Sequence, residues 1–272
     1  MRIILIALLP ALLAAEDAPA GPPPPRRGWD ISLGAMGLAA PASPGSDQQS
    51  RRVLPFLKAS YDRKLFIGSN PAVLGLGLAV RALEKGPLSW DFGVGYMEGR
   101  KESLANVLAG MGNQTGSIWA GTAVHYRLGP LEMGIAGAHG LYGEAGNRFK
   151  LNLGSHLPLG PRWLMGAQAS LGISDSKGMA YEFGVDSTQA AKRQAMIAAG
   201  DTRLRGDEGR EYHPGGGLRD AGLGLMLGYQ LGRGWGLMGT VNASHLMKNA
   251  ADSPLVRKQN TVSAGMGINY HF

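Results

Sequence analysis

The stretch Asn260-Thr-Val-Ser-Ala-Gly-Met-Gly-Ile-Asn-Tyr-His-Phe272 alternates apolar side chains with polar or small ones. One face would carry Val262, Ala264, Met266, Ile268, Tyr270 and Phe272, and the other Thr261, Ser263, Gly265, Gly267, Asn269 and His271. Successive side chains of a β-strand point to opposite faces. A half-buried strand of a soluble sheet shows the same pattern, so one such segment leaves the class of sheet open.

The alternation recurs along most of the chain, which favours a barrel in a membrane over a soluble sheet. Comparable segments begin at Trp29, Trp90, Ser117, Phe149, Trp163, Gly222 and Trp235. Charged residues fall almost wholly on the face opposite the large apolar ones, as expected when that apolar face meets lipid. We therefore predict an all-β fold, a transmembrane antiparallel β-barrel of about 12 strands over residues 28–272. The alternation of faces also predicts that Leu225→Arg, on the lipid face, prevents assembly of the barrel, whereas Gly224→Ser, on the opposite face, has only a mild effect.

The predicted connections alternate in length, as in outer-membrane barrels with short periplasmic turns and long extracellular loops. Short turns are expected at residues 61–64, 84–87, 129–130, 160–161 and 232–234, and long ones at 40–51, 99–113, 175–217 and 248–258. Eleven strands are evident. The twelfth requires a turn at Asn70-Pro71 that splits residues 64–83 in two.

The N-terminal region and the composition agree with an exported protein. Residues 1–15 resemble a signal peptide, with Arg2, an apolar run and a small-residue cleavage site. Residues 16–27, which include Pro22 to Pro25, are expected to form a flexible periplasmic segment. The chain has 43 Gly and no Cys among 272 residues. Glycine disfavours helices, and a closed barrel needs no disulfides. We expect the protein in the outer membrane of a Gram-negative bacterium.

Aromatic residues gather at one predicted level of the barrel. If the short turns lie at the periplasmic end, eight aromatic residues fall on the lipid face near that end: Trp29, Trp90, Tyr126, Trp163, Tyr229, Trp235, Tyr270 and Phe272. Tryptophan and tyrosine are enriched at membrane–water interfaces. These residues predict a periplasmic aromatic girdle.

Charged residues on the opposite face predict a network inside the lumen. Its members are Asp30, Lys58, Arg81, Asp91, Arg127, Glu132, Arg148 and Lys150, joined by Asp220. Such a network could make the lumen an ion-selective pore, or could fill it with internal salt bridges, which is the interpretation we favour.

The chain shows no recognisable catalytic, cofactor or metal site. Three histidines (His125, His156, His271), three acids (Asp30, Asp91, Glu132) and three serines (Ser117, Ser170, Ser263) would face the lumen. A hydrolase needs such groups within hydrogen-bonding reach of one another. The alternation shows only that they share a face and gives no distances between them. No histidine pair has the spacing of metal ligands.

The long connection 175–217 is predicted to lie outside the cell and to contain a helix over Asp186 to Ala199, with Asp186 or Ser187 as its N-cap. It would either cap the barrel or fold into it. Its basic residues are Lys192, Arg193, Arg203, Arg205 and Arg210. They could bind lipopolysaccharide phosphates, although a solvated basic loop is the simpler interpretation. The charge of +7 is scattered along the chain, so nucleic acid is not an expected partner.

The chain resembles the MipA/OmpV family, the MltA-interacting proteins of Gram-negative outer membranes. The matching stretches are Pro41 to Asp47, Arg52 to Phe56, Tyr61, Leu65 to Gly68, Tyr181 to Val185, Gln189 to Ala191, Gly217 to Asp220 and Asn249 to Val256. Ala251-Asp-Ser-Pro-Leu-Val256 is the most specific of them, although Asp252-Ser253-Pro254 is also ordinary turn chemistry. The segment from Lys192 to Arg210 is more basic than the family pattern.

The resemblance implies a non-enzymatic barrel, and no cofactor is expected from the sequence. It also implies a scaffold that joins a lytic transglycosylase to a penicillin-binding protein. The sequence leaves open two alternatives, a passive or ion-selective pore and a surface antigen or adhesin. Outer-membrane lipids and lipopolysaccharide are the expected surroundings.

Overall fold

Twelve antiparallel strands close into a barrel in the computed structural model, which describes residues 28–68, 70–73, 75–142 and 145–272. The strands are β1 (Trp29–Pro41), β2 (Gln49–Tyr61), β3 (Leu65–Gly68), β4 (Leu76–Lys85), β5 (Leu88–Met97), β6 (Ser117–Leu128), β7 (Leu131–Gly140), β8 (Asn147–Pro158), β9 (Trp163–Ser174), β10 (Gly217–Gly232), β11 (Trp235–Leu246) and β12 (Asn260–His271). Each strand pairs with its neighbour in sequence, and β12 pairs with β1. The predicted fold class and strand number are confirmed, including the division of residues 64–83.

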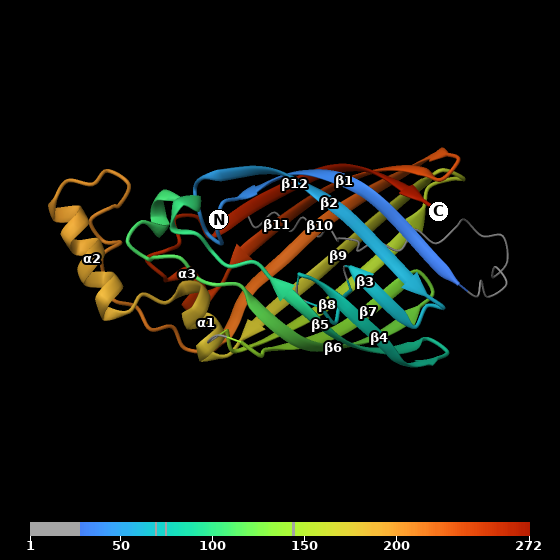
Figure 1. Cartoon of the computed structure of the whole chain (residues 1–272), viewed down its shortest axis with the longest axis horizontal. Helices are drawn as coiled ribbons and strands as arrows, with labels where there is room; N and C mark the ends of the chain where they lie inside the picture. Colours follow the sequence, from blue (N-terminus) through green and yellow to red (C-terminus); the bar gives the residue numbers. More distant parts are fainter. Residues whose placement is uncertain (1–27, 69, 74, 143–144) are drawn as a thin grey trace, which may run out of the picture.

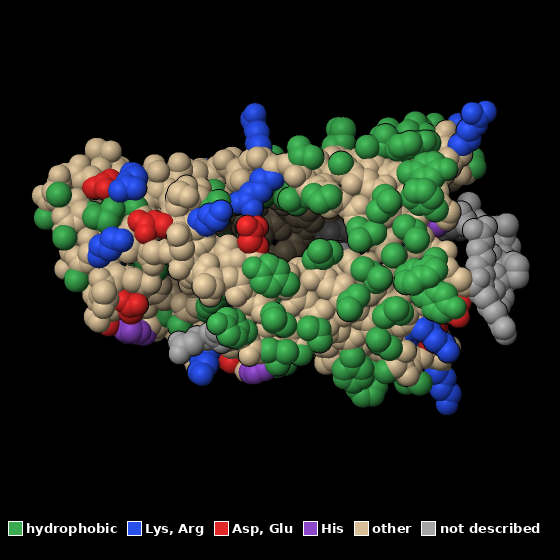
Figure 2. All heavy atoms as spheres, viewed as in Figure 1, with side chains coloured by type: hydrophobic (Ala, Val, Ile, Leu, Met, Phe, Trp, Pro, Cys, Tyr) green, Lys and Arg blue, Asp and Glu red, His purple; other side chains and the backbone are tan. Residues whose placement is uncertain are grey.

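The alternation seen in the sequence becomes an apolar outer surface. Large apolar side chains on the apolar faces of β12 and β11, such as Met266, Ile268 and Val241, are exposed. Figure 2 shows these side chains as a broad apolar zone over the barrel, with charged groups concentrated toward its two ends. Because a soluble barrel would turn such residues inward, this surface is built to meet hydrocarbon.

The connections separate by length between the two ends of the barrel. Residues 62–64, 86–87, 129–130, 159–162 and 233–234 make the short turns, where Phe272 also lies. The long connections 42–48, 98–116, 175–216 and 247–259 lie at the opposite, extracellular end, so the predicted alternation of short and long connections is confirmed. No helix among the described residues has the length and apolarity needed to cross a membrane. The expected signal peptide 1–15 and segment 16–27 lie outside the described residues.

Strand β3 is short because the chain leaves the wall at Gly68 and turns into the lumen. The amide of Asn70 donates to Asp91 on the inner face of β5, at 3.3 Å. Inner-face glycines make room for this inward loop: a Cβ on Gly93 would lie 2.5 Å from Val73, and one on Gly121 would lie 2.3 Å from the Ala72 carbonyl. The sequence predicted the turn at Asn70-Pro71 but not its direction.

Four extracellular connections (residues 42–48, 98–116, 175–216 and 247–259) fold together into a cap over the barrel (Figure 1). The cap contains 3-10 turns η1 (Glu102–Leu104) and η2 (Asn106–Leu108), and helices α1 (Ser176–Phe183), α2 (Ser187–Ala198) and α3 (Lys248–Ala251). Buried apolar clusters join these connections: Ala42 packs with Leu108, Met111 with Val185 and Leu255, and Phe183 with Leu246.

Helix α2 confirms the predicted helix at residues 186–199. Asp186 is its N-cap and forms a capping box with Gln189. Helix α1 was not predicted. Its N-cap is Asp175, whose carboxylate accepts a hydrogen bond from the Gly178 N–H. Helix α1 contacts the tops of β8 and β9, whereas α2 stands farther from the barrel. The 175–217 connection therefore caps the mouth, with α1 as its inner layer.

Candidate functional site

An ion-pair cluster at the extracellular mouth connects the cap to the barrel wall. We call it the mouth cluster, and its members are Arg148 on β8, Glu182 on α1, and Arg219 and Asp220 on β10. Strict alternation would place Arg219 and Asp220 on opposite faces of β10. A register shift between Leu218 and Asp220 opposite β9 inserts one extra residue there. Such a bulge re-aims side chains, and both side chains line the same cavity at the mouth, where Arg219 lies against both Glu182 and Asp220.

Glu182 is the centre of this cluster. Its carboxylate lies 3.0 Å from Arg148 Nη2 and 3.1 Å from Arg219 Nη1, and its own backbone carbonyl accepts a bond of 2.9 Å from Arg100. Arg219 also contacts Asp220 at 2.5 Å. Burial alone would raise the pKa of Glu182, but the two guanidinium groups outweigh this effect and hold that pKa below its ordinary value of 4.5.

The Arg148 side chain also stacks on Trp119. The guanidinium lies 4.6 Å from the ring centroid, and Trp119 is 1% exposed on the inner face of β6. The other four tryptophans lie on the outer face. A cation–π contact of this kind gains strength when it is shielded from water, so Trp119 helps to fix the arginine that receives Glu182.

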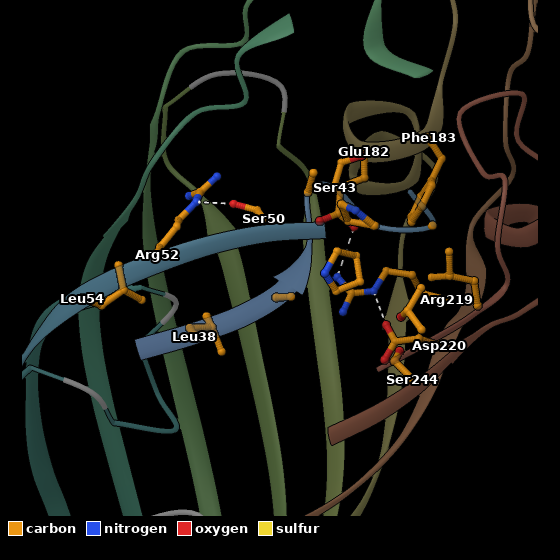
Figure 3. A pocket seen from close by; sticks show the side chains of 17 residues that line it. Leu38, Ser43, Ser50, Arg52, Leu54, Glu182, Phe183, Arg219, Asp220 and Ser244 are labelled. Carbon is orange, nitrogen blue, oxygen red and sulfur yellow. Dashed lines mark hydrogen bonds and ion pairs between the residues drawn. The ribbon is translucent and has the colours of Figure 1, made fainter. Parts of the chain in front are cut away.

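Two cavities lie inside the barrel and both reach Arg219. The upper one, of about 440 Å³, is bounded by β1, β2, α1 and the tops of β10 to β12. Figure 3 shows Leu38, Arg52 and Leu54 on one side of it and Glu182, Arg219 and Asp220 on the other. The second, of about 320 Å³, lies between the inward loop at Asn70 and the inner faces of β6 to β9.

Acid should loosen the cap at the mouth cluster. A carboxylate whose pKa is lowered by folding stabilises the folded form above its unfolded pKa, and this contribution is lost as pH falls through the folded value. For Glu182 the loss therefore begins below 4.5. We expect hydrogen exchange of α1 amides, corrected for intrinsic rates, to accelerate in that range, and Glu182→Gln to show fast exchange already at neutral pH. Equal protection of α1 in both proteins at neutral pH would contradict this role of Glu182.

The lumen charges predicted from the sequence form separate groups in the structure rather than one network. Arg81 pairs with Asp91 at 2.9 Å, and Glu132 pairs with His125 at 3.0 Å and with Arg127 at 3.2 Å. Arg148 belongs to the mouth cluster, and Asp30 lies 3.6 Å from His271. Lys150 lines the second cavity, and Lys58 lies on β2 an even number of residues from Arg52, which lines the upper one. Sequence reasoning missed Glu182 and Arg219, although both stand inside the stretches that carry the family resemblance.

The serines, histidines and acids considered for catalysis are dispersed. Ser117 donates to the Tyr142 carbonyl, and His125 is bound to Glu132. At the other end of the barrel, Ser32 and Asp30 both contact His271 through the same atom, Nδ1. A relay needs the serine hydroxyl and the orienting acid on different ring nitrogens of the histidine, so this trio does not have the required arrangement. Within the described residues, no cluster of three or more His, Asp or Glu is suited to a metal ion.

The interpretation of residues 192–210 as a solvated basic loop is wrong for Arg193. This side chain is 0% exposed, and it donates to the carbonyls of Val107, Ala109 and Glu208. It therefore ties α2 to the 98–116 connection. The neighbouring basic residues have partners in the cap: Lys192 contacts Glu102, Arg203 contacts Asp201, Arg205 contacts Asp47, and Arg210 donates to the Asp252 carbonyl.

Paired aromatic rings lie on the outer face at the short-turn end. Ring centroids are 5.3 Å apart for Trp29 and Tyr61, 4.5 Å for Trp163 and Tyr229, and 5.1 Å for Trp235 and Tyr270. Phe272 packs edge-to-face against Tyr270, and Trp90 and Tyr126 are exposed on the same face. This is the position predicted for the girdle, and its interfacial role remains a proposal.

A closed antiparallel barrel with an apolar outside, a polar inside and short turns at one end defines an outer-membrane β-barrel protein. The family model of MltA-interacting protein MipA matches residues 33–272. The chain belongs to this family and is located in the Gram-negative outer membrane.

Comparison with solved structures gives other outer-membrane barrels at low identity. OprB of Pseudomonas putida is 7% identical, with a TM-score of 0.44 over 90% of this chain and 94% of that one. An outer-membrane channel from Pseudomonas putida F1 is 11% identical, with a TM-score of 0.41 over 94% and 100%. OmpT of Vibrio cholerae with loop L8 deleted is 7% identical, with a TM-score of 0.39 over 90% and 98%. No curated protein matches the chain.

Proposed function

We propose that this protein is a non-enzymatic envelope scaffold that binds a murein-cleaving lytic transglycosylase at its periplasmic rim. The observation that carries the proposal is the cap: four connections with their own buried clusters cover the mouth, and Glu182 fixes them to two wall strands. A barrel covered in this way is better suited to interaction than to bulk diffusion. The family description, MltA-interacting protein, supports the choice of partner. A murein-synthesising penicillin-binding protein would be its second partner.

The periplasmic turns offer a basic surface for such a partner. Exposed cations stand on or directly beside four of them: Arg63 and Lys64, Lys85, Arg162, and Arg233. Arg63 is paired with Glu84 at 2.9 Å. Charged residues at the rim of an interface steer association and make it sensitive to salt, so an acidic face on the transglycosylase is expected.

Replacing three of these cations should weaken partner binding. We expect Lys64→Gln, Lys85→Gln and Arg233→Gln together to lower the affinity of the barrel in nanodiscs for the purified transglycosylase by roughly tenfold at low salt. The matched control changes three exposed lysines of the extracellular end, Lys101, Lys177 and Lys258, to glutamine, and it should bind like the unchanged protein. Biolayer interferometry measures both. Equal losses in the two triple variants, or no binding of the unchanged barrel, would refute the docking site.

A pore is the second candidate function, and the two lumen cavities that reach Arg219 favour it. Planar-bilayer recordings on the same preparation separate the candidates. Stable unitary currents from the unchanged protein without transglycosylase binding would support the pore, and binding without such currents would support the scaffold.

A further inference from the structure

The barrel wall has an opening beside β2. This strand pairs with β1 along all of Gln49–Tyr61, but with β3 only from Lys58 to Tyr61. The chain leaves the wall at Gly68, where φ is 107°. Within the part of the chain that the structure describes, Gln49 to Leu57 therefore have no ladder partner on the β3 side. Figure 2 shows the wall hollowed between the upper part of β2 and the neighbouring strands.

The opening lies in the half of the barrel that meets the outer leaflet. With a strand tilt near 40°, each residue advances about 2.5 Å along the barrel axis. Tyr61 lies at the short-turn end, so Leu57 stands about 10 Å above it and Arg51 about 25 Å above it. The apolar band of such barrels is about 25 Å tall. An open strand edge at this depth is unfavourable unless it borders a polar interior or is covered.

The exposed edge of β2 is poorly suited to pairing with another strand. Asp62 donates its N–H to Gly28 on the β1 side, so the N–H groups of odd-numbered β2 residues face the opening. Pro55 is one of these, and it has no N–H. Proline on an open edge discourages strand addition. Val53, also odd, is 78% exposed and presents an apolar side chain to the bilayer.

The inner side of this edge lines the upper cavity. Ser50, Arg52 and Leu54 alternate inward from the unpaired stretch of β2 and border the 440 Å³ space. Leu38 from β1 continues the apolar wall beside Leu54 (Figure 3). The volume lies in the range of small-molecule sites. The same stretch of β2 therefore borders the opening with its unpaired backbone edge and the upper cavity with its inward side chains.

The cavity has a positive group at the opening. Across the cavity, Arg219 is neutralised by Glu182 and Asp220. Arg52 contacts the Ser50 hydroxyl at 3.0 Å and, among the described residues, no carboxylate. A cation next to an apolar wall matches a molecule with an alkyl chain and an anionic end.

We propose that the opening admits a single-chain anionic amphiphile, a fatty acid in its chemical class, from the outer leaflet into the upper cavity. Its chain lies along Leu38 and Leu54, and its carboxylate is bound by Arg52. This site is separate from the periplasmic docking surface and does not depend on the scaffold role.

Binding of dansyl-labelled undecanoic acid to the full-length mature barrel in nanodiscs tests the proposal. The unchanged protein should bind it saturably, and the corresponding primary amide roughly tenfold more weakly. Arg52→Gln should also weaken acid binding roughly tenfold, and Leu54→Trp should abolish it by filling the cavity. Arg51→Gln and Val53→Trp are the matched controls, because these neighbours point outward, and both should bind normally. Only preparations that are fully heat-modifiable on gels enter the comparison.

Three results would overturn the proposal. The first is equal affinity of Arg52→Gln and the unchanged protein, and the second is equal losses in Arg52→Gln and Arg51→Gln. The third is a barrel that dimerises through the β2 edge, detected as a cross-link between single cysteines placed at Val53 in two copies, because the edge would then be closed by a second copy.

Discussion

Val241→Arg should sharply reduce the folded yield of the barrel, whereas the same substitution at the adjacent Asn242 should leave the barrel assembled. Val241 is 50% exposed on the outer face of β11, between Leu225 and Ala264 of the neighbouring strands. It lies six residues above Trp235, near the middle of the apolar band. Arginine on the lipid face at this depth costs about 2–4 kcal/mol, a large part of the stability of an ordinary domain.

Asn242→Arg is the matched control, because it introduces the same side chain at the adjacent position of the same strand. Asn242 is exposed toward the lumen, where a guanidinium keeps its contact with water. The assay compares boiled and unboiled protein on a gel, because a folded barrel migrates differently from an unfolded chain, together with a β-type circular dichroism spectrum. If both arginine variants assembled equally well, β11 would not be crossing a bilayer there.

The control suggested by the sequence, Gly224→Ser, is unsuitable. Parity alone predicted a mild effect because Gly224 faces the lumen. In the structure, a Cβ on Gly224 would lie 2.1 Å from Asn242 Oδ1 and 2.8 Å from the Val241 carbonyl oxygen. The Asn242 side chain could move aside, but the Val241 backbone is held in the sheet and could not move freely. A serine at position 224 would therefore be strained. Alternation identifies the face of a residue but not the space beside it.

The strand arrangement could be predicted from the sequence because lipid imposes a strict rule on one face of every strand. The segments that begin at Trp163 and Trp235 show the rule plainly, and both are strands with the expected parity. Turn chemistry placed the short connections, and the capping box at Asp186 and Gln189 placed α2.

The candidate site was only partly predictable, for reasons that lie outside local patterns. The bulge at Arg219 breaks the alternation that assigned faces, and Glu182 meets the barrel only because α1 folds over the mouth. Similarly, Arg193 looked like one more surface cation, yet three backbone carbonyls from distant segments accept its hydrogen bonds. These contacts form only when connections that are far apart in the sequence fold together, so local sequence patterns do not predict them.

Removing the Glu182 carboxylate should release the cap and open the barrel to ions. Glu182→Leu leaves Arg148 and Arg219 without the anion they share, while α1 gains a leucine at a site surrounded by guanidinium groups. Breaking a buried ion pair from one side costs about 3–5 kcal/mol, because the remaining charges stay desolvated. A movement of α1 away from β8 and β10 would let more water and ions reach these charges and relieve that cost.

We therefore expect planar-bilayer recordings of Glu182→Leu to show unitary currents larger or more frequent than those of the unchanged protein. Trypsin should also cleave faster at Lys177 in α1. Glu211→Leu is the control, since it removes an exposed carboxylate of the same cap that pairs only with His213 among the described residues. The barrel itself should stay heat-modifiable in both variants, because each of its strands is paired with two other strands. Indistinguishable currents from Glu182→Leu and Glu211→Leu would mean that the mouth cluster does not hold the cap closed, and the case for a covered barrel would then rest on the apolar clusters alone.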